Sequence, residues 1–407
     1  MYDVIVVGGG ASGMMAAAVA ASLGKNTLLI EKMPRTGRKI LVTGKGRCNV
    51  TNACDVESVM KKTVSNPKFL YSALMGFTPQ DTMELFESLG VPLKVERGNR
   101  VFPVSDRAMD IADALSEFCK KNGVKVLTDT VTDITTENGT VTGVKTALQS
   151  HFLANSVVLA TGGVSYPATG STGDGYKLAQ NLGHTITPLR AALVGLKIAG
   201  KDCPQMQGLS LKNTALSLIS KKNGKTIFSD MGEMLFTHFG MSGPMVLSAS
   251  SYITNSPSDY QIILDLKPAL SIEKLDERIS RDFSERKNKD IINALDALLP
   301  KAMIPVVIER SAISPHQKVN QITRTQRLNL CENIKAMRFD VAGRDDIETA
   351  IVTAGGVSVK EINPKTMQSK LAKGLYFTGE VIDVDACTGG FNLQIAFSTG
   401  YAAGTNA

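Results

Sequence analysis

Three glycines near the N-terminus have the spacing of a phosphate-binding turn. Gly8, Gly10 and Gly13 form a G-x-G-x-x-G pattern directly after the apolar run YDVIVV. In such a turn the first glycine permits a tight bend and the second lets the backbone approach a pyrophosphate, while the third lets a helix pack on its strand. The first N–H groups of that helix, those of Ala11 and Ser12 among them, face the phosphates with partial positive charge.

A carboxylate completes this pattern. Glu31 lies 18 residues after Gly13 and ends a second apolar run, TLLIE. A carboxylate at this place accepts hydrogen bonds from an adenosine ribose and disfavours a 2′-phosphate. Between the two runs, MMAAAVAASLG predicts a helix that ends at Gly24. Strand, glycine turn, helix, strand and acid together predict a dinucleotide site, because glycines that served only packing would not explain Glu31.

The composition sets the frame for this site. With 407 residues the chain is expected to form two or three domains. The net charge of +7 permits anionic ligands, but the basic residues are spread along the chain, which does not favour nucleic acid as a partner. None of the six cysteines forms a C-x-x-C pair. We therefore expect neither a metal site nor a disulfide framework, and a reducing cytoplasm as the location.

The apolar N-terminal stretch, residues 4–23, resembles a signal peptide or a membrane span. Asp3 stands where a signal peptide carries positive charge, and four glycines interrupt the stretch. A buried strand followed by a buried helix explains it better, so we expect no membrane span.

The middle of the chain distinguishes FAD from a nicotinamide dinucleotide. Residues 151–163, HFLANSVVLATGG, predict a strand that returns to the first sheet, and residues 124–147 resemble an inserted β meander. Such a meander is usual in FAD-binding domains and absent from simple nicotinamide-binding ones. No second G-x-G-x-x-G follows. We therefore expect no separate nicotinamide domain, and NAD(P)H, if it is the reductant, would visit the flavin directly as a transient donor.

The C-terminal segment supplies the other half of a flavin site. A strand at residues 375–378 is followed by Gly379-Glu380, by Asp383 and by Gly389-Gly390, which opens a helix at about Asn392. In flavoproteins with two dinucleotide-binding motifs, an acid in this segment holds the ribityl chain. The helix N-terminus stabilises the negative charge that the flavin N1–C2=O edge gains on reduction.

The sequence resembles the BaiN/YhiN-type NAD(P)/FAD-dependent oxidoreductase family in five blocks that span nearly the whole chain. They are RTGRKILVTGKGRCNVTN, ATGGVSYPATGSTGDGYKLAQNLGH, LFTHFGMSGPMVLSAS, TAGGVSVKEINPKTMQSK and GLYFTGEVIDVDACTGGFNLQIAF. The resemblance implies an α/β fold: a glutathione-reductase-type FAD-binding Rossmann domain, an inserted antiparallel β-barrel domain and a small helical subdomain. Members described as enzymes include a reductase of 3-oxo-Δ4-type bile-acid intermediates and an aminoacetone oxidase. The resemblance thus implies fold and cofactor more than substrate.

We expect three parts. The FAD-binding domain comprises residues 1–186 and 351–407, the β-barrel substrate domain 187–270 and 334–350, and the helical subdomain 271–333.

Within the insertion, LSLKNTALSLIS and QIILDLKP predict antiparallel strands. IEKLDERISRDFSERK, IINALDALLP and TRTQRLNLCENI predict helices, the first capped by Ser271, and MSGPMVLSAS predicts a helix capped by Ser242. The helical subdomain is either a solvated surface or a lid over the active site.

The stretch KILVTGKGRCNVTN follows Glu31 closely and is predicted to form a second wall of the FAD site. Backbone N–H groups of its glycines can approach the cofactor, and its basic side chains, Lys45 included, can balance phosphate charge. With the motifs above, the expected FAD-binding residues are Gly8, Gly10, Ala11, Ser12, Gly13, Glu31, Lys32, Arg38, Lys39, Thr43, Gly44, Gly46, Arg47, Cys48, Asn49, Val131, Thr161, Gly162, Gly379, Glu380, Asp383, Gly390, Phe391, Asn392 and Leu393.

Three side chains are candidates for catalysis, each with a structural alternative. Tyr166, in the turn GGVSYP, can protonate a substrate carbon or polarise a carbonyl, or it can simply pack on the turn. His238 can act as an acid or oxyanion donor, or as a hydrogen-bonded core histidine. Cys48 can be a redox cysteine beside Arg47, but no resolving cysteine has suitable spacing, which favours packing or flavin contact. Arg344 can bind a substrate anion or form a surface ion pair.

The leading hypothesis is an FAD-dependent reductase that saturates an activated C=C bond of a small-molecule enone, such as a 3-oxo steroid or bile acid. The alternatives are an FAD-dependent oxidase of a small amine that produces hydrogen peroxide and, in another class, an RNA-binding or RNA-modifying flavoprotein. The sequence leaves the oligomeric state open.

Overall fold

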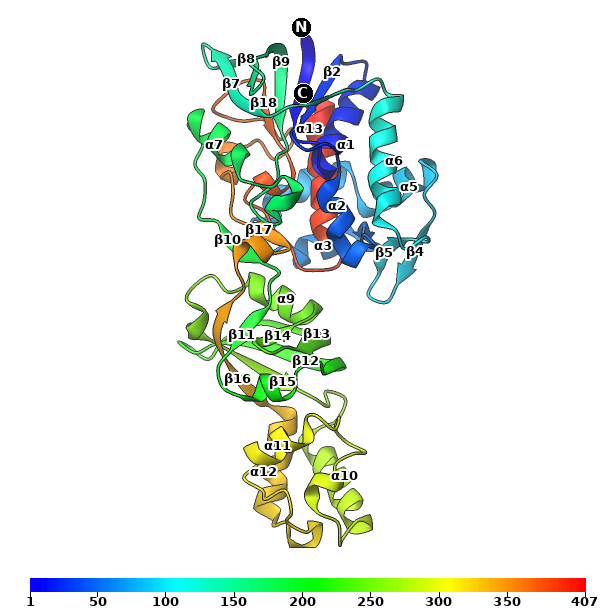
Figure 1. Cartoon of the computed structure of the whole chain (residues 1–407), viewed down its shortest axis with the longest axis vertical. Coiled ribbons are helices and arrows are strands. Elements are labelled where there is room, and N and C mark those ends of the chain that lie inside the picture. Colours follow the sequence, from blue (N-terminus) through cyan, green and yellow to red (C-terminus); the bar gives the residue numbers. More distant parts are fainter. The chain divides into compact units, whose positions relative to one another are not determined.

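The computed structural model describes residues 1–407 and divides them into two units (Figure 1). The first unit comprises Met1–Ala192 and Asp346–Ala407, and the second comprises Leu193–Asp345. The second unit is therefore an insertion into the first. The division falls within six residues of the two boundaries expected for the FAD-binding domain, and the helical stretch 271–333 belongs to the second unit.

The first unit is built on a mainly parallel sheet whose central strand is β1 (Tyr2–Val7). β1 pairs in parallel with β2 (Thr27–Glu31) on one side and with β9 (His151–Leu159) on the other. β6 (Lys125–Thr128) extends the sheet beyond β2, and β18 (Leu375–Phe377) pairs in parallel with β9. The last four residues of β1 are buried, as expected for a strand that is covered on both faces.

The β meander is shorter than the sequence suggests. It consists of β7 (Val131–Glu137), β8 (Thr140–Thr146) and β9, joined antiparallel. Residues 125–128 belong to the parallel sheet instead, because helix α6 (Ala108–Lys121) crosses over and returns the chain beside β2.

Short elements complete the first unit. They are α2 (Arg38–Val42), β3 (Thr51–Asn52), α3 (Val56–Lys62), α4 (Tyr71–Gly76), α5 (Pro79–Ser88), β4 (Leu93–Glu96), β5 (Arg100–Pro103), α7 (Asp174–Asn181), β10 (Arg190–Ala192) and β17 (Val352–Ala354).

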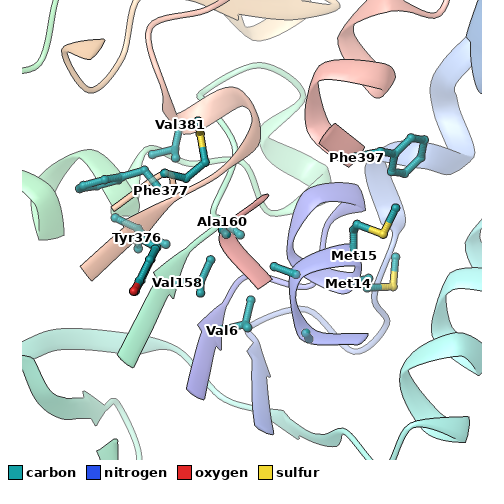
Figure 2. Packing of buried hydrophobic residues seen from close by; sticks show 14 of the residues in the cluster. Val6, Met14, Met15, Val158, Ala160, Tyr376, Phe377, Val381 and Phe397 are labelled. Atoms are coloured by element: carbon teal, nitrogen blue, oxygen red, sulfur yellow. The ribbon is translucent and has the colours of Figure 1, made fainter. Parts of the chain in front are cut away.

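Two apolar helices, α1 (Ala11–Ser22) and α13 (Phe391–Asn406), pack directly on each other. Their backbones touch: a Cβ atom added to Gly404 would lie 2.5 Å from the carbonyl oxygen of Ala16. Figure 2 shows side chains of both helices in the same core as those of the sheet strands. Only glycine permits so close an approach, so small residues determine where α13 lies.

The contact also sets the register of the two helices. Gly400 faces the Ser12 oxygen, as Gly404 faces the Ala16 oxygen, so α1 and α13 run parallel. α13 begins at Phe391, nine residues before Gly400, which corresponds to about 14 Å of helix. The N-terminus of α13 therefore lies well beyond that of α1, on the same side of the sheet. One helix can face a pyrophosphate and the other the far end of the same cofactor.

A buried glutamine fixes the first turns of α13 against the neighbouring elements. The Gln394 Oε1 accepts hydrogen bonds from the hydroxyls of Thr51 (2.6 Å) and Thr82 (2.8 Å). Its Nε2 donates to the carbonyl oxygen of Phe77 and to the Ser398 hydroxyl. Every polar atom of this amide has a partner, so the contact stabilises the helix position without leaving a buried group unpaired.

The second unit contains a closed antiparallel barrel in the order β11-β14-β13-β12-β15-β16. The strands are β11 (Leu196–Ile198), β12 (Ser210–Ser220), β13 (Thr226–Phe236), β14 (Gly240–Ser242), β15 (Tyr260–Asp265) and β16 (Met337–Arg344). The helices are α8 (Asp202–Gln205), α9 (Pro244–Ser251), α10 (Ile272–Glu285), α11 (Ile304–Arg310) and α12 (Arg324–Lys335).

Two local expectations for this unit are wrong. Ser242 does not cap α9: it ends β14, and Gly243, with φ of +94°, is the N-cap. The segment IINALDALLP is not an α-helix and forms only a 3₁₀ turn at Ile291–Asn293. Its N–H groups at Ile291 and Ile292 donate to carbonyls of the 315–317 loop, so tertiary hydrogen bonds replace helical ones. The Ser271 cap of α10 is confirmed.

His184, which follows α7, forms a buried cluster with Glu361 and Ser369. None of the three residues is among the predicted FAD-binding residues. His184 is bonded through Nδ1 to Glu361 (3.2 Å) and through Nε2 to the Ser369 hydroxyl (2.9 Å). The Ser369 oxygen already accepts N–H bonds from Leu371 and Ala372, so its own proton goes to His184. The imidazole is 3% exposed, which leaves no room for a substrate. The cluster is a structural link.

We expect the close helix contact to govern stability. Replacing Gly404 by Ala should lower the free energy of unfolding by about 1–3 kcal/mol, because the added methyl group meets backbone rather than a movable side chain. The control is Gly76→Ala in α4, where an added Cβ meets nothing within 4 Å and should be neutral or stabilising. Urea denaturation measures both; equal effects would contradict the packing argument.

The His184 cluster predicts a pH dependence of stability. Burial lowers the pKa of His184 from its usual 6.5, although Glu361 opposes the shift. The folded state therefore binds fewer protons than the unfolded chain, and the contribution is fully present above pH 6.5 and declines as the pH falls below it. The free energy of unfolding should fall more steeply between about pH 7 and 5 in the wild type than in His184→Gln. Parallel slopes would show that His184 does not titrate.

Candidate functional site

The glycine turn has the geometry that a pyrophosphate requires. A Cβ atom on Gly8, whose φ is +104°, would lie 2.6 Å from the Ala160 oxygen, and one on Gly13 would lie 1.9 Å from the Gly8 oxygen. A Cβ on Gly10 would meet nothing within 4 Å. Gly8 and Gly13 are thus needed for the fold, whereas Gly10 borders open space. No side chain caps the start of α1, so its N–H groups are available to phosphate oxygens.

Glu31, the acid expected from the sequence to bind the ribose, is held in place by the backbone. Each oxygen of Glu31 accepts one N–H bond, from Gly9 at 2.7 Å and from Met33 at 2.8 Å. Each oxygen keeps lone pairs for the two ribose hydroxyls. The N–H of Asp129 donates to the Glu31 carbonyl, which brings the chain just before Val131 next to this acid. This neighbourhood fits an adenosine.

A second polar cluster joins four segments that are far apart in the chain. The Lys39 ammonium contacts Glu380 and the Ser165 hydroxyl, both at 2.7 Å. Glu380 also accepts bonds from Ser165 (3.0 Å) and from the N–H of Thr353 (2.7 Å). Lys39 and Glu380 were expected from the sequence to bind the cofactor, and the structure brings them together. The sequence analysis did not predict Ser165 and Thr353 as part of the site. The only sequence feature that could have indicated them is their position, Ser165 directly before Tyr166 and Thr353 two residues before Gly355.

The loop after α2 has an unusual backbone. Gly44, Lys45, Gly46 and Cys48 all have left-handed φ values, between +57° and +85°. Such runs turn successive N–H groups toward one side and create a concave site for anionic oxygens. Lys45 and Cys48 adopt this conformation without being glycine, which costs each about 1 kcal/mol or more. This backbone supports the expected second wall of the FAD site.

Arg47 in this loop is engaged with protein carboxylates. Its guanidinium pairs with Glu96 and Asp106 and lies 4.2 Å from the centroid of the Phe102 ring. These carboxylates raise the pKa of Arg47 further, and they oppose the phosphate contact that the sequence suggests.

Cys48 is fully buried, which raises the pKa of its thiol to about 12. The thiol stays protonated at neutral pH, so the structure does not support the thiolate chemistry considered for Cys48. A packing role accords with this burial.

Asn49 connects the loop to the start of α13. In the amide orientation that satisfies its neighbours, its oxygen accepts the Gly390 N–H at 3.0 Å, and its nitrogen donates to the carbonyls of Thr51 and Val101. A Cβ on Gly390 would lie 2.3 Å from the Thr51 oxygen, so only glycine fits here. Asn49 therefore serves the helix N-terminus itself, and the flavin contact expected of it remains a prediction.

The other expected cofactor residues lie around these clusters. Lys32 bonds Asp174 and Thr172, and Arg38 donates to the Ala168 oxygen. The Thr161 hydroxyl, buried beside Gly162, has no protein partner. The remaining contacts are Thr43 to Ile40, Gly379 to Thr399, Asp383 to Asn66 and Asn392 to Ala386, with Phe391 and Leu393 packed in the core.

The catalytic candidates fall in different units. Tyr166 adopts a left-handed conformation, with φ of +52°, directly after Ser165 of the Lys39 cluster. That position supports a role near the cofactor. His238 lies in the second unit, exposed at the turn between β13 and β14, with its ring against Phe239. Arg344 donates to the Ile253 carbonyl within the second unit, so it has a structural partner that the sequence did not indicate.

A family model described as HI0933-like protein Rossmann domain matches residues 2–406. The chain belongs to the HI0933-like family.

Relatives of this HI0933-like protein cover almost its full length. It is 31% identical over 410 residues to a 3-dehydro-bile acid delta(4,6)-reductase of Clostridium scindens, covering 99% of this chain and 98% of the relative. It is 33% identical over 404 residues to a ribosomal RNA dihydrouridine synthase of Escherichia coli, covering 98% and 96%. A 3-ketosteroid delta1-dehydrogenase structure from Sterolibacterium denitrificans shares the fold, with a TM-score of 0.53, 15% identity and coverage of 99% and 98%.

Family and fold establish the class of this HI0933-like protein. It is an FAD-dependent oxidoreductase with a Rossmann-type FAD-binding domain, as the sequence predicted. The open space at Gly10, the anchored Glu31 and the helix N-termini fit FAD. No helix has both the length and the apolar character to cross a membrane, and no cluster of three or more metal-ligating side chains occurs.

Glu31 should determine FAD affinity in this HI0933-like protein. Glu31→Gln places an NH₂ group where the acid accepts an N–H bond and weakens the bonds to ribose, so the Kd for FAD should rise about 10- to 100-fold. Glu57→Gln, at an exposed site in α3, is the control and should bind FAD normally. Titration of the apoprotein followed by flavin fluorescence measures both. Unchanged binding in Glu31→Gln would contradict the ribose assignment.

Proposed function

We propose that this enzyme reduces a ring C=C bond that is conjugated to a carbonyl group. The observation that carries the proposal is that full-length relatives with two different substrates share this chemistry. A 3-oxo-Δ4,6 bile acid has a C=C bond conjugated to its C3 carbonyl. Dihydrouridine forms by saturation of the uridine C5=C6 bond, which is conjugated to a carbonyl in the same way.

Bound FAD would supply a hydride in this reaction. The protein's part is to hold the cofactor through Glu31, the α1 N-terminus and the Lys39–Glu380 cluster. The first turn of α13 carries partial positive charge, which would stabilise the negative charge of the reduced flavin if its N1–C2=O edge lies there. Tyr166 and His238 remain the candidates for placing a proton on the substrate.

A 3-oxo steroid or bile acid is the first candidate substrate. The first unit has a shallow, open depression of about 700 Å³ that a steroid-sized ligand could occupy; Met60, Tyr71 and Met75 give it apolar surface, and Asp55 and Glu57 also line it. Its wall at Cys54 follows Asn52, whose amide bonds the Gly389 carbonyl just before α13.

Uridine in RNA is the second candidate, and the charge distribution supports it. The second unit has 21 Lys and Arg against 16 Asp and Glu, whereas the first unit has 24 against 22. Most of the net charge of +7 thus lies in the inserted unit, which suits a polyanionic substrate.

One anaerobic experiment tests the reaction and the substrates together. The holoenzyme is reduced with NADPH, NADH or dithionite and mixed with a 3-oxo-Δ4,6 bile acid or with an unmodified ribosomal RNA transcript. Reoxidation of the flavin with a saturated product supports the proposal, and salt-sensitive turnover of the transcript selects RNA. Reduction of the flavin by aminoacetone, with peroxide release in air and no C=C reduction, would overturn it in favour of an amine oxidase.

A further inference from the structure

Two loops that connect the helices of the second unit lie side by side. One follows α10 and the other precedes α12 (Figure 1). Four backbone hydrogen bonds join them: residues 291–292 donate two to the 315–317 carbonyls, and residues 319–320 donate two to the carbonyls of Lys289 and Lys287. Ile291 and Val319 are buried, so backbone bonds and core contacts together fix the two loops.

These loops and the start of α12 are strongly basic. Residues 286–290 and 315–324 contain five lysine or arginine residues and only one acid, Asp290. Lys318 pairs with Asp290 at 2.8 Å, and the His316 ring lies 3.5 Å from the same carboxylate. The single acid of these segments is therefore already shared by two basic side chains.

Three of the basic side chains have no carboxylate within ion-pair distance. They are Lys287, Lys289 and Arg324, and all three are exposed. The fifth cation, Arg286, pairs with Asp296 and is not part of the argument. The exposed basic residues form what we call the basic loop surface: Lys287, Lys289, His316, Lys318 and Arg324.

The charges of the basic loop surface do not serve the stability of the fold. Like charges that lie close together without partners repel one another and destabilise the folded chain. Arg324 is also the first residue of α12, whose first turn contains no acid. A cation at this end opposes the helix dipole. Arg327, one turn later, already binds the nearby Asp276, so that carboxylate is occupied.

The surroundings of these charges distinguish between two polyanionic partners, RNA and an anionic membrane. Stable binding to a membrane surface combines basic residues with apolar side chains that enter the lipid. No large hydrophobic side chain between residues 286 and 324 is exposed. Exposed amides at Asn288 and Asn320 lie among the lysines instead, and such groups bond sugar hydroxyls and base edges. The composition of the surface favours RNA.

We propose that the basic loop surface binds the phosphate backbone of structured RNA. The inference rests on the proposed function, with uridine in RNA as the substrate, and names the residues that hold the polyanion. Their role is binding, and none of them takes part in the reduction. An RNA is far larger than its target base, so a surface of the inserted unit can bind the RNA while the cofactor unit acts on the base.

The test removes the three unpaired charges and measures RNA binding. The holoenzyme is titrated against the unmodified ribosomal RNA transcript by filter binding between about 50 and 200 mM KCl. The variant Lys287→Gln/Lys289→Gln/Arg324→Gln should bind about 30-fold more weakly than the wild type at the lowest salt. Its plot of log Kd against log [KCl] should be flatter by about two units, because about three phosphate contacts are lost.

A matched control separates this surface from net charge. Lys25→Gln/Lys121→Gln/Lys365→Gln removes the same three charges from exposed, unpaired positions of the first unit and should bind RNA as the wild type does. Lys287→Arg/Lys289→Arg keeps the charge and should also bind normally. Flavin content and urea midpoint should be equal in all variants, because every change is at the surface.

Three results would overturn the proposal. They are no binding of the transcript by the wild type at low salt, equal loss in the two triple variants, and binding of phosphatidylserine vesicles in place of RNA. The proposed function is judged separately by C=C reduction. If the transcript binds through this surface but neither substrate is reduced, the proposed function fails while the RNA surface stands. If the bile acid is reduced and the transcript is not bound, the reverse holds.

Discussion

The backbone contact between α1 and α13 is the constraint on which the rest of the first unit depends. Glycines at 400 and 404 let α13 lie directly on the carbonyls of Ser12 and Ala16. Because the helices are parallel and offset by about two turns, their N-termini face two different points along one line. FAD has negative charge at two such points, the pyrophosphate and the reduced flavin. The same glycines thus determine both core packing and electrostatics.

The polar groups around this helix pair are mostly held by backbone or by one another. Gly9 and Met33 hold Glu31, the Thr353 N–H holds Glu380, and Asn49 holds the Gly390 N–H. Such fixed groups need little reorganisation when a charged cofactor binds, which is the condition for strong electrostatic stabilisation.

Relatives that act on a bile acid and on ribosomal RNA match nearly the whole chain with similar identity. Their shared element is the conjugated C=C bond and not the size or charge of the molecule that contains it. Under the proposed function, one FAD-binding unit can serve both kinds of substrate, provided that other surfaces select between them. The inserted unit carries most of the net positive charge, so under the proposed function it is where an anionic substrate would be selected.

The sequence by itself determined the glycine turn, the two flanking strands, the FAD cofactor and the inserted barrel. These features depend on local spacing or on blocks of contiguous residues. Only the tertiary structure decided which side chains contact one another. Lys39 meets Glu380 across 341 positions, Arg47 pairs with acids, and Ser165, Thr353, Arg190 and Asp385 gather from separate segments. Residues 125–128 form a strand of the parallel sheet and not of the meander. The segment IINALDALLP is not helical, because two of its N–H groups donate to carbonyls of the 315–317 loop. Local propensity cannot predict such outcomes, because the competing hydrogen bonds come from residues that are near only after the chain has folded.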